Sequence, residues 1–281
     1  MSLYERLFEL SDFWVFIVSV VGVWLLSLLA TLFMVVLKSL FPHKGPSLVA
    51  TMLTGILLPT GMVITFVASD VWQSDAKGRV AVEEEASAIS DSLRVTKHLS
   101  AAQARPITAL IKEYARSAVE VEWPLMSKSD ASDETEEYLE QLMVAAVSLQ
   151  ASQVPGSAQF IAAQELRKYV TRIELARDTR LRVSQVEVQI PKWVAVFVML
   201  FVSACVLAEL HISSRRALAI STLLFSLGFG VTIYLIAAYD RPFTGKTIID
   251  PWSLEQILKR SQADRADNSP LSAVPAGSIA Q

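Results

Sequence analysis

The sequence is short of charge and of the residues from which chemical sites are usually built. Of its 281 residues 19% are charged, against about 25% in an average soluble domain. A single cysteine, Cys205, excludes an intrachain disulfide framework and a zinc site built on several cysteines. A net charge of −3 argues against a nucleic-acid partner, which needs a strongly basic face. Since 52% of the residues are hydrophobic, disorder throughout the chain is excluded as well.

The common catalytic patterns are also absent. The sequence has no Gly-x-Ser-x-Gly elbow, no phosphate loop, no dinucleotide fingerprint and no His-Glu-x-x-His. An acidic run over 133–137 lacks the spacing of a calcium loop and reads instead as a helix start after Ser132. We therefore predict that the protein is not an enzyme and has no cofactor, no metal site and no catalytic residue.

What the chain does have is long apolar runs. Phe13–Leu37, Gly45–Ser69 and Ala217–Tyr239 contain no charged residue, and Trp193–Ala208 is a shorter run that Glu209 closes. A helix needs about 20 apolar residues to cross the hydrocarbon core of a bilayer. The runs therefore predict four transmembrane helices, the third of them with Glu209 near the headgroups, and the lipid bilayer as a partner.

A polar segment separates the second and third runs, and its pattern is helical. Acids precede bases in Gly78–Leu99, a second helix is expected from Pro106 to Glu122 with Pro124 as its end, and apolar residues recur at helical spacing in two further segments. We expect the helices over 70–104 and 156–190 to extend the membrane helices. The fold class is thus an all-α membrane protein with a helical extramembrane insert between the second and third spans. The predicted divisions are an N-terminal leader (1–12), the first transmembrane pair (13–69), the helical domain (70–192), the second pair (193–239), a C-terminal elbow and short helix (240–260) and a disordered tail (261–281).

The short loops carry the charge that orients the spans. Lys38 and Lys44 lie in one loop, Arg215 and Arg216 in the other, and neither loop holds an acid. Positive charge in short loops is typical of the cytoplasmic side. This count predicts that the insert and both termini are extracytoplasmic.

Five residues of the spans are candidates for a pore or gate. Proline in the middle of the second span interrupts the helix, and interrupted helices often line a cavity. An acid close to a span interior is costly and often functional, although Glu209 has Arg215 or Arg216 as an alternative, purely structural partner. The candidates are Pro59, Thr60, Gly61, Thr65 and Glu209.

Other features of the spans leave two interpretations open. Gly228 and Gly230 in the fourth span either shape a narrow pore or let helices pack closely. His43 and His211 fall in the two short loops, where they are either solvated residues or part of a metal or proton site.

Three motifs, in this order around four spans, resemble the bestrophin-like domain family of bacterial membrane proteins. They are Glu84-Glu85-Ala86 leading to Ser92-Leu93, then Tyr114 through Glu122-Trp123-Pro124, then Asp240-Arg241-Pro242-Phe243-Thr244-Gly245 with Asp250-Pro251. The resemblance covers roughly residues 10 to 260 and implies a protein of the bacterial inner membrane. Its name implies a likeness to bestrophins, pentameric anion channels that keep their soluble helical region in the cytoplasm. The charge count predicts the opposite side for this insert, and the likeness is one of architecture.

The resemblance and the interrupted second span together suggest the function. We expect an integral, multi-pass, channel-like homo-oligomer that passes small ions. The alternative is a membrane-anchored scaffold or sensor that acts through the helical insert. The segment 240–245 either locks the C-terminal helix onto the insert as part of a gate or simply ends the fourth span with a salt bridge.

Overall fold

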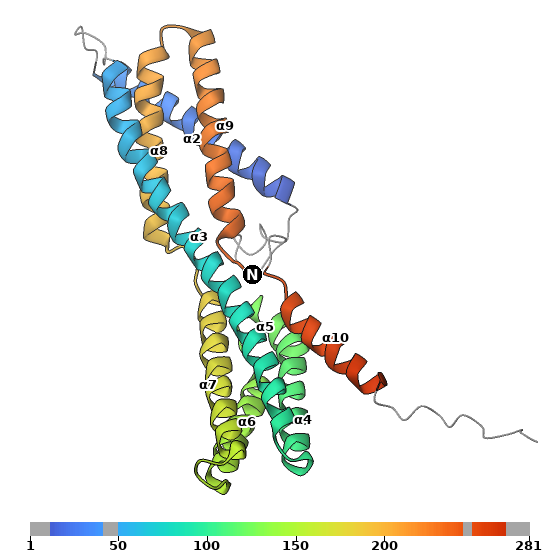
Figure 1. The fold of residues 1–281 in the computed structure, drawn as a ribbon. Coiled ribbons are helices and arrows are strands. Elements are labelled where there is room, and N and C mark those ends of the chain that lie inside the picture. The colour runs from blue at the N-terminus through green and yellow to red at the C-terminus, as the bar shows by residue number, and fades with distance from the viewer. Residues whose placement is uncertain (1–11, 42–49, 244–248, 268–281) are drawn as a thin grey trace, which may run out of the picture. The chain divides into compact units, whose positions relative to one another are not determined.

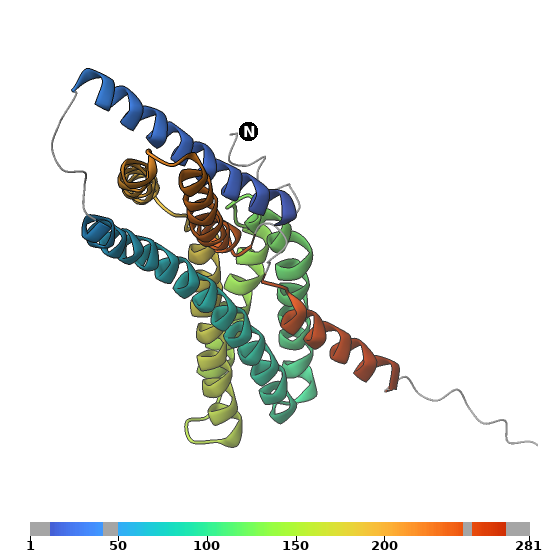
Figure 2. The same cartoon turned by 90° about the horizontal axis from the view of Figure 1, so that it is seen from above.

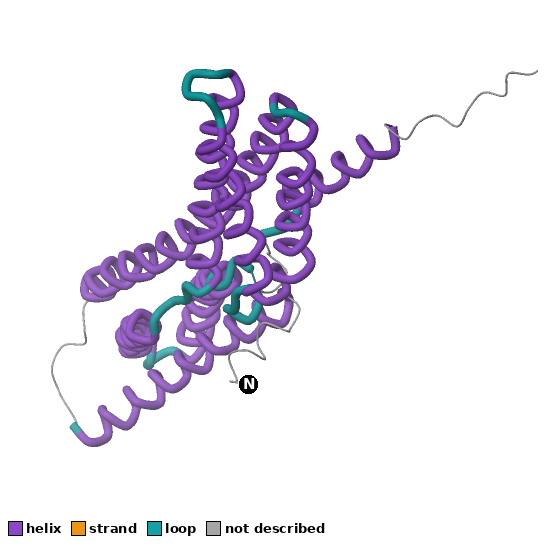
Figure 3. Tube along the Cα trace, turned by 90° about the horizontal axis from the view of Figure 1, so that it is seen from below, coloured by secondary structure: helices purple, strands orange, loops and turns teal. Residues whose placement is uncertain are grey.

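The computed structural model describes residues 12–41, 50–243 and 249–267. Within these ranges the chain consists of helices joined by loops and contains no strand (Figure 3). The predicted all-α class is therefore confirmed.

The chain divides into two compact units. The span unit comprises residues 1–77 and 183–249, and the insert unit comprises residues 78–182 and 250–281. Two helices, α3 (Ala50–Val95) and α7 (Ala158–Ser184), run through a boundary between the units (Figure 1). The boundaries between the units therefore fall inside these helices. They differ from the ends of the polar segment, which begins at residue 70 and ends at residue 192.

The span unit contains α2 (Asp12–Leu40), the first part of α3, α8 (Ile190–His211) and α9 (Arg215–Tyr239). Each of these four helices is long and apolar enough to cross a membrane. α2 packs beside α8 and α9, as Figure 2 shows from above. Buried residues of all four helices, such as Val23, Ile64, Leu200 and Ile233, form one core.

α3 continues through Pro59 without a break, which corrects the expected interruption of the second span. Proline has no N–H for the carbonyl one turn before it. One turn of the helix is reinforced by the Thr60 hydroxyl, which donates to the Ile56 carbonyl at 2.8 Å.

The insert unit packs the second part of α3 with α4 (Ala101–Ser117), α6 (Asp133–Ser152), α7 and α10 (Trp252–Asp267). Between α4 and α6 lie a π-helical turn, η2 (Ala118–Glu122), and the short α5 (Trp123–Met126). A 3-10 turn, η1 (Thr96–His98), follows α3. The apolar stripes of these helices form a single core that includes Ile89, Ile111, Leu142 and Leu166.

Several predicted boundaries within the insert are wrong. Pro106 lies inside α4, which begins at Ala101, and Pro124 does not end the helical path because η2 and α5 carry it to Met126. α7 ends at Ser184, and residues 185–189 are not helical, so α7 does not extend the third span. α10 continues to Asp267, beyond the expected start of the tail at 261; residues 268–281 and the leader up to residue 11 lie outside the described residues.

Candidate functional site

The second span has two distinct faces. Thr60, Ile64, Val67 and Val71 are buried and recur at spacings of three and four. Thr60 has no exposed surface, and its hydroxyl lies 2.9 Å from the Ser203 hydroxyl of α8. Thr60 is therefore a packing residue, which corrects its expected place in a pore lining.

The opposite face of the second span is exposed. Leu58, Met62 and Phe66 expose 68%, 52% and 66% of their surface, and Pro59 and Thr65 are also exposed. Gly61 is half-buried, and a Cβ added to it would meet no atom within 4 Å. Of the predicted residues, Pro59, Gly61 and Thr65 thus lie where another molecule or an aqueous path has room.

Glu209 is the acid closest to a span interior. Its Oε1 lies 2.9 Å from Nζ of Lys38 in α2, while Oε2 is buried without a hydrogen-bond partner. The salt-bridge partner of Glu209 is thus Lys38, and not Arg215 or Arg216, the partners that the sequence suggested. The metal or proton site that the sequence left open in the loops gains no support: His43 lies outside the described residues, and the described part of the chain gathers no group of three or more His, Cys, Asp or Glu.

The 240–245 motif fastens the end of α9 to the segment before α8. The buried carboxylate of Asp240 accepts the Val188 N–H at 2.7 Å, and Arg241 Nη2 lies 2.6 Å from Glu187 Oε2. The Pro242 carbonyl accepts the Ile249 N–H at 2.9 Å, and Phe243 is buried. Gly245 lies outside the described residues. The motif is therefore more than a helix end, because it also holds residues 187–188 in place.

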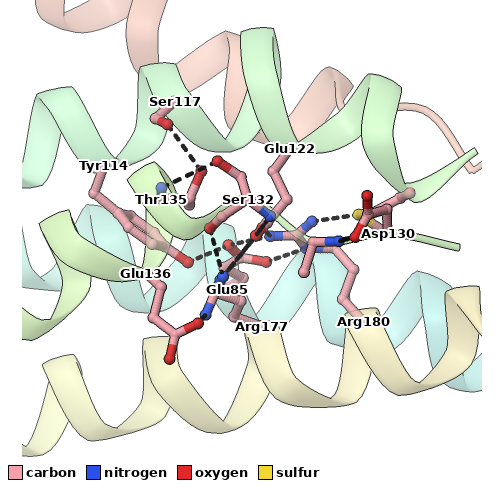
Figure 4. Close-up of polar contacts among 12 residues, drawn as sticks. Glu85, Tyr114, Ser117, Glu122, Asp130, Ser132, Thr135, Glu136, Arg177 and Arg180 are labelled. Carbon is pink, nitrogen blue, oxygen red and sulfur yellow. Dashed lines mark hydrogen bonds and ion pairs between the residues drawn. The ribbon is translucent and has the colours of Figure 1, made fainter. Parts of the chain in front are cut away.

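The most concentrated chemistry lies in the insert unit, where two acids and two arginines form a buried network. Arg180 of α7 has no exposed surface. Its Nε donates to Glu85 Oε2 at 2.7 Å, and its Nη2 donates to Glu85 Oε1 at 3.0 Å and to Glu122 Oε2 at 2.8 Å (Figure 4). One guanidinium thus joins a carboxylate of α3 to a carboxylate of η2.

Arg177 extends the network by one helical turn. Its Nη2 donates to Glu122 Oε1 at 2.7 Å and to the Ser132 carbonyl at 3.3 Å, and its Nη1 lies 3.9 Å from Glu136 Oε2. The Ser132 N–H donates to Glu122 Oε1 at 3.4 Å, and its hydroxyl caps α6 by accepting the Thr135 N–H at 3.2 Å. The start of α6 is thereby tied to α7 and η2 (Figure 4).

Tyr114 of α4 completes the network from the remaining side. Its hydroxyl donates to Glu85 Oε1 at 2.6 Å. Burial, together with the negative charge of Glu85, raises the pKa of Tyr114 well above its usual value. Burial lowers the pKa of Arg180, but Glu85, Glu122 and Tyr114 together outweigh burial, so that the pKa of Arg180 is raised. The phenol therefore stays a hydrogen-bond donor and the guanidinium stays charged. In formal charge, the two acids and the two arginines of the network cancel.

The π-helical turn places Glu122 in this network. It comes directly before Trp123 and Pro124, and π-turns inside helices often occur at functional sites. The guanidinium carbon of Arg180 lies 5.2 Å from the centre of the Trp123 ring, and Nη1 contacts the Met126 sulfur at 2.6 Å. The motif Glu122-Trp123-Pro124 thus surrounds Arg180 on one side.

Sequence reasoning singled out Glu85, Tyr114 and Glu122 only as motif residues and missed Arg177 and Arg180. A signal was present in the periodicity. Buried Leu166, Val170 and Ile173 recur at helical spacing along α7, and the same spacing continues to Arg177 and Arg180. Two cations on a buried stripe require buried acids as partners.

Comparison with known proteins gives a family and a fold. The family model for the bestrophin-like domain matches residues 15–254. Crystal structures of a bacterial bestrophin homologue from Klebsiella pneumoniae are similar: one mutant form has a TM-score of 0.67 at 12% identity, covering 89% of this chain and 97% of that chain. The form solved by Zn-SAD phasing has a TM-score of 0.66 at 12% identity and covers 89% and 99%. No curated protein matches the sequence.

Proposed function

Because the chain belongs to the bestrophin-like domain family over residues 15–254, we propose that it is a homo-oligomeric channel for small ions in a bacterial membrane. Bestrophin homologues share its fold, and four of its helices can cross a bilayer. The likeness to bestrophins favours a channel over an enzyme. The observation that carries the proposal is the exposed face of the second span.

In the proposed channel this face lines the pore. Leu58, Met62 and Phe66 recur every fourth residue, so copies around an axis would form stacked apolar rings. Apolar constrictions gate ion flow by dewetting. Thr65 and Pro59 supply smaller side chains on the same side of the helix, beside Gly61.

Two of the sequence candidates support the lining without being part of it. Thr60 holds the second span against Ser203 of α8, and Glu209 joins α8 to Lys38 of α2. A span held by such contacts presents its exposed face in a defined orientation.

Replacing Met62 with serine is expected to raise ion flux several-fold, because a polar ring removes an apolar barrier. The measurement is flux through liposomes that contain the purified protein, at several pH values and with different cations and anions. Leu224→Ser is the matched control, since Leu224 is a similarly exposed residue of α9, at 63%. If both variants changed the ion flux equally, the exposed face of the second span would not be the pore lining. Flux no greater than in empty vesicles would contradict a channel, and specific partners captured by the insert would then favour the scaffold or sensor.

The sidedness of the insert depends on which charges are counted. The rule includes Lys and Arg within about 15 residues of span ends, and acids contribute little. On the side of the insert and termini there are eight such residues, against four in the short loops. We therefore propose that the insert and termini face the cytoplasm, in place of the side predicted from the short loops alone. The eight are Arg6, Lys77, Arg79, Arg180, Arg182, Lys192, Arg241 and Lys246.

Reporter fusions decide the sidedness. A fusion after residue 44 is expected to show periplasmic alkaline phosphatase activity, and one within the insert is expected to show cytoplasmic fluorescence. The reverse pattern would return the insert to the extracytoplasmic side. Opposite sides for the two termini would contradict the four-span topology.

A further inference from the structure

A hollow on the surface of the insert unit lies between α6 and α7. Its volume is about 290 Å³, just below the ~300–1,000 Å³ of typical small-molecule sites. Both walls belong to the insert unit, so the hollow lies within one compact body. We call it the α6–α7 cavity. The residues that line it are polar, and none is acidic: Gln150, Gln164, Arg167, Lys168 and Thr171.

Helical spacing gathers four of these residues on one side of α7. They recur at spacings of three and four, and residues so spaced are neighbours on a helix surface. The four are Gln164, Arg167, Lys168 and Thr171. Gln150 meets them from the last part of α6, where its Oε1 accepts from Arg167 Nη1 at 3.3 Å. The cavity is thus walled by side chains of two helices that this hydrogen bond joins.

Two of the lining residues are cations that keep donors for an anion. Arg167 is exposed, and its guanidinium carries a fork of N–H donors. Among the described residues its side chain makes one hydrogen bond, the one to Gln150. Lys168 Nζ pairs with Glu165 Oε1 at 2.6 Å, and 59% of the Lys168 side chain is exposed. Because an exposed pair of this kind adds little to stability, an anion in the cavity can compete with Glu165 for the ammonium.

The remaining lining residues are neutral and suit the same ligand. The carboxamides of Gln150 and Gln164 each carry an N–H₂ group that can donate to a ligand oxygen. The Thr171 hydroxyl donates to the Arg167 carbonyl at 3.1 Å, and its oxygen can accept from a protonated ligand oxygen. The cavity therefore offers donors and positive charge, and none of its lining residues brings a negative charge.

We infer that the α6–α7 cavity binds a small anion of phosphate chemistry, which is either a soluble phosphate or the phosphate of a lipid headgroup. A planar guanidinium donates two parallel hydrogen bonds to phosphate, and a nearby ammonium adds a second positive charge. A phosphate monoester carries about −1.5 to −2 charges at neutral pH, so two cations match it better than they match a single carboxylate. The inference goes beyond the proposed function, because binding in the insert unit requires no ion to cross the membrane.

The experiment measures the binding of radiolabelled inorganic phosphate to the full-length protein in phosphatidylcholine nanodiscs at constant ionic strength. We expect saturable binding in the wild type, an affinity about tenfold lower in Arg167→Gln and a several-fold lower affinity in Lys168→Gln. Arg172→Gln is the matched control. Arg172 is an exposed cation of the same helix that does not line the cavity, and its guanidinium carbon lies 6.0 Å from the centre of the Tyr169 ring. Thermal unfolding of all three variants is expected to match the wild type, because the replaced side chains are exposed.

Two further nanodisc preparations separate the sources of the phosphate. One contains phosphatidic acid, and the other carries the same negative charge as oleate. Weaker binding of inorganic phosphate with phosphatidic acid than with oleate identifies a lipid headgroup as the occupant, and equal binding identifies a soluble phosphate. Absence of saturable binding in the wild type, or an equal loss of affinity in Arg172→Gln, overturns the inference. Phosphate binding and ion flux are measured separately, so the inference and the proposed channel can fail independently.

Discussion

Replacing Arg180 by methionine is expected to unfold the insert unit at much lower temperature than the wild type. Methionine keeps much of the volume but leaves Glu85 and Glu122 buried with one arginine between them. Breaking a buried ion pair by removing one partner costs about 3–5 kcal/mol. The measurement is thermal unfolding of the purified protein in detergent, followed by helical circular dichroism.

The structure supplies both a control and a rescue for this prediction. Arg172 lies on the same helix with its side chain exposed, so Arg172→Met is expected to change stability little. The double variant Glu85→Gln/Arg180→Met removes one charge of each sign and leaves the Arg177–Glu122 pair, at 2.7 Å, intact. It is expected to recover part of the loss, because the contacting residues are coupled. A double variant less stable than the sum of the two single changes would contradict the network as described.

The second large effect is expected at Gly230, where α9 meets α2. A Cβ at this position would lie 2.7 Å from the Val20 Cα and 2.8 Å from its Cγ2. A backbone atom cannot move aside as the end of a side chain can, so Gly230→Ala must separate the two helices. Overpacking of this kind typically costs about 1–3 kcal/mol. Thermal unfolding in detergent and the yield of folded protein measure the effect.

Gly228 is the matched control, two residues earlier in the same helix. A Cβ there meets no atom within 4 Å, so Gly228→Ala is expected to be neutral or slightly stabilising in a helix. Equal loss in both variants would place the effect in the helix itself rather than in the contact with Val20. For Gly230, close packing is thus the role that the structure supports, of the two interpretations that the sequence left open.

The corrections to the sequence predictions share a physical cause. From local propensity Pro59 was expected to interrupt a helix, Pro106 to begin one and Pro124 to end one, yet all three lie within helical segments. The cost of a lost hydrogen bond is offset when the helix packs against its neighbours. Local pattern does not report such compensation.

The sequence by itself determined the solvent and the helical class of this protein. Runs of 23 to 25 residues without charge are long enough to cross a bilayer, and periodic apolar stripes indicate packed helices; both patterns involve only residues close together in the chain. The tertiary structure alone decided which charges meet. Glu85 and Arg180 are 95 positions apart, and Glu209 selects Lys38 over nearer cations. Pairing at such separations is set by how the helices pack. The same packing decides which face of α3 stays exposed.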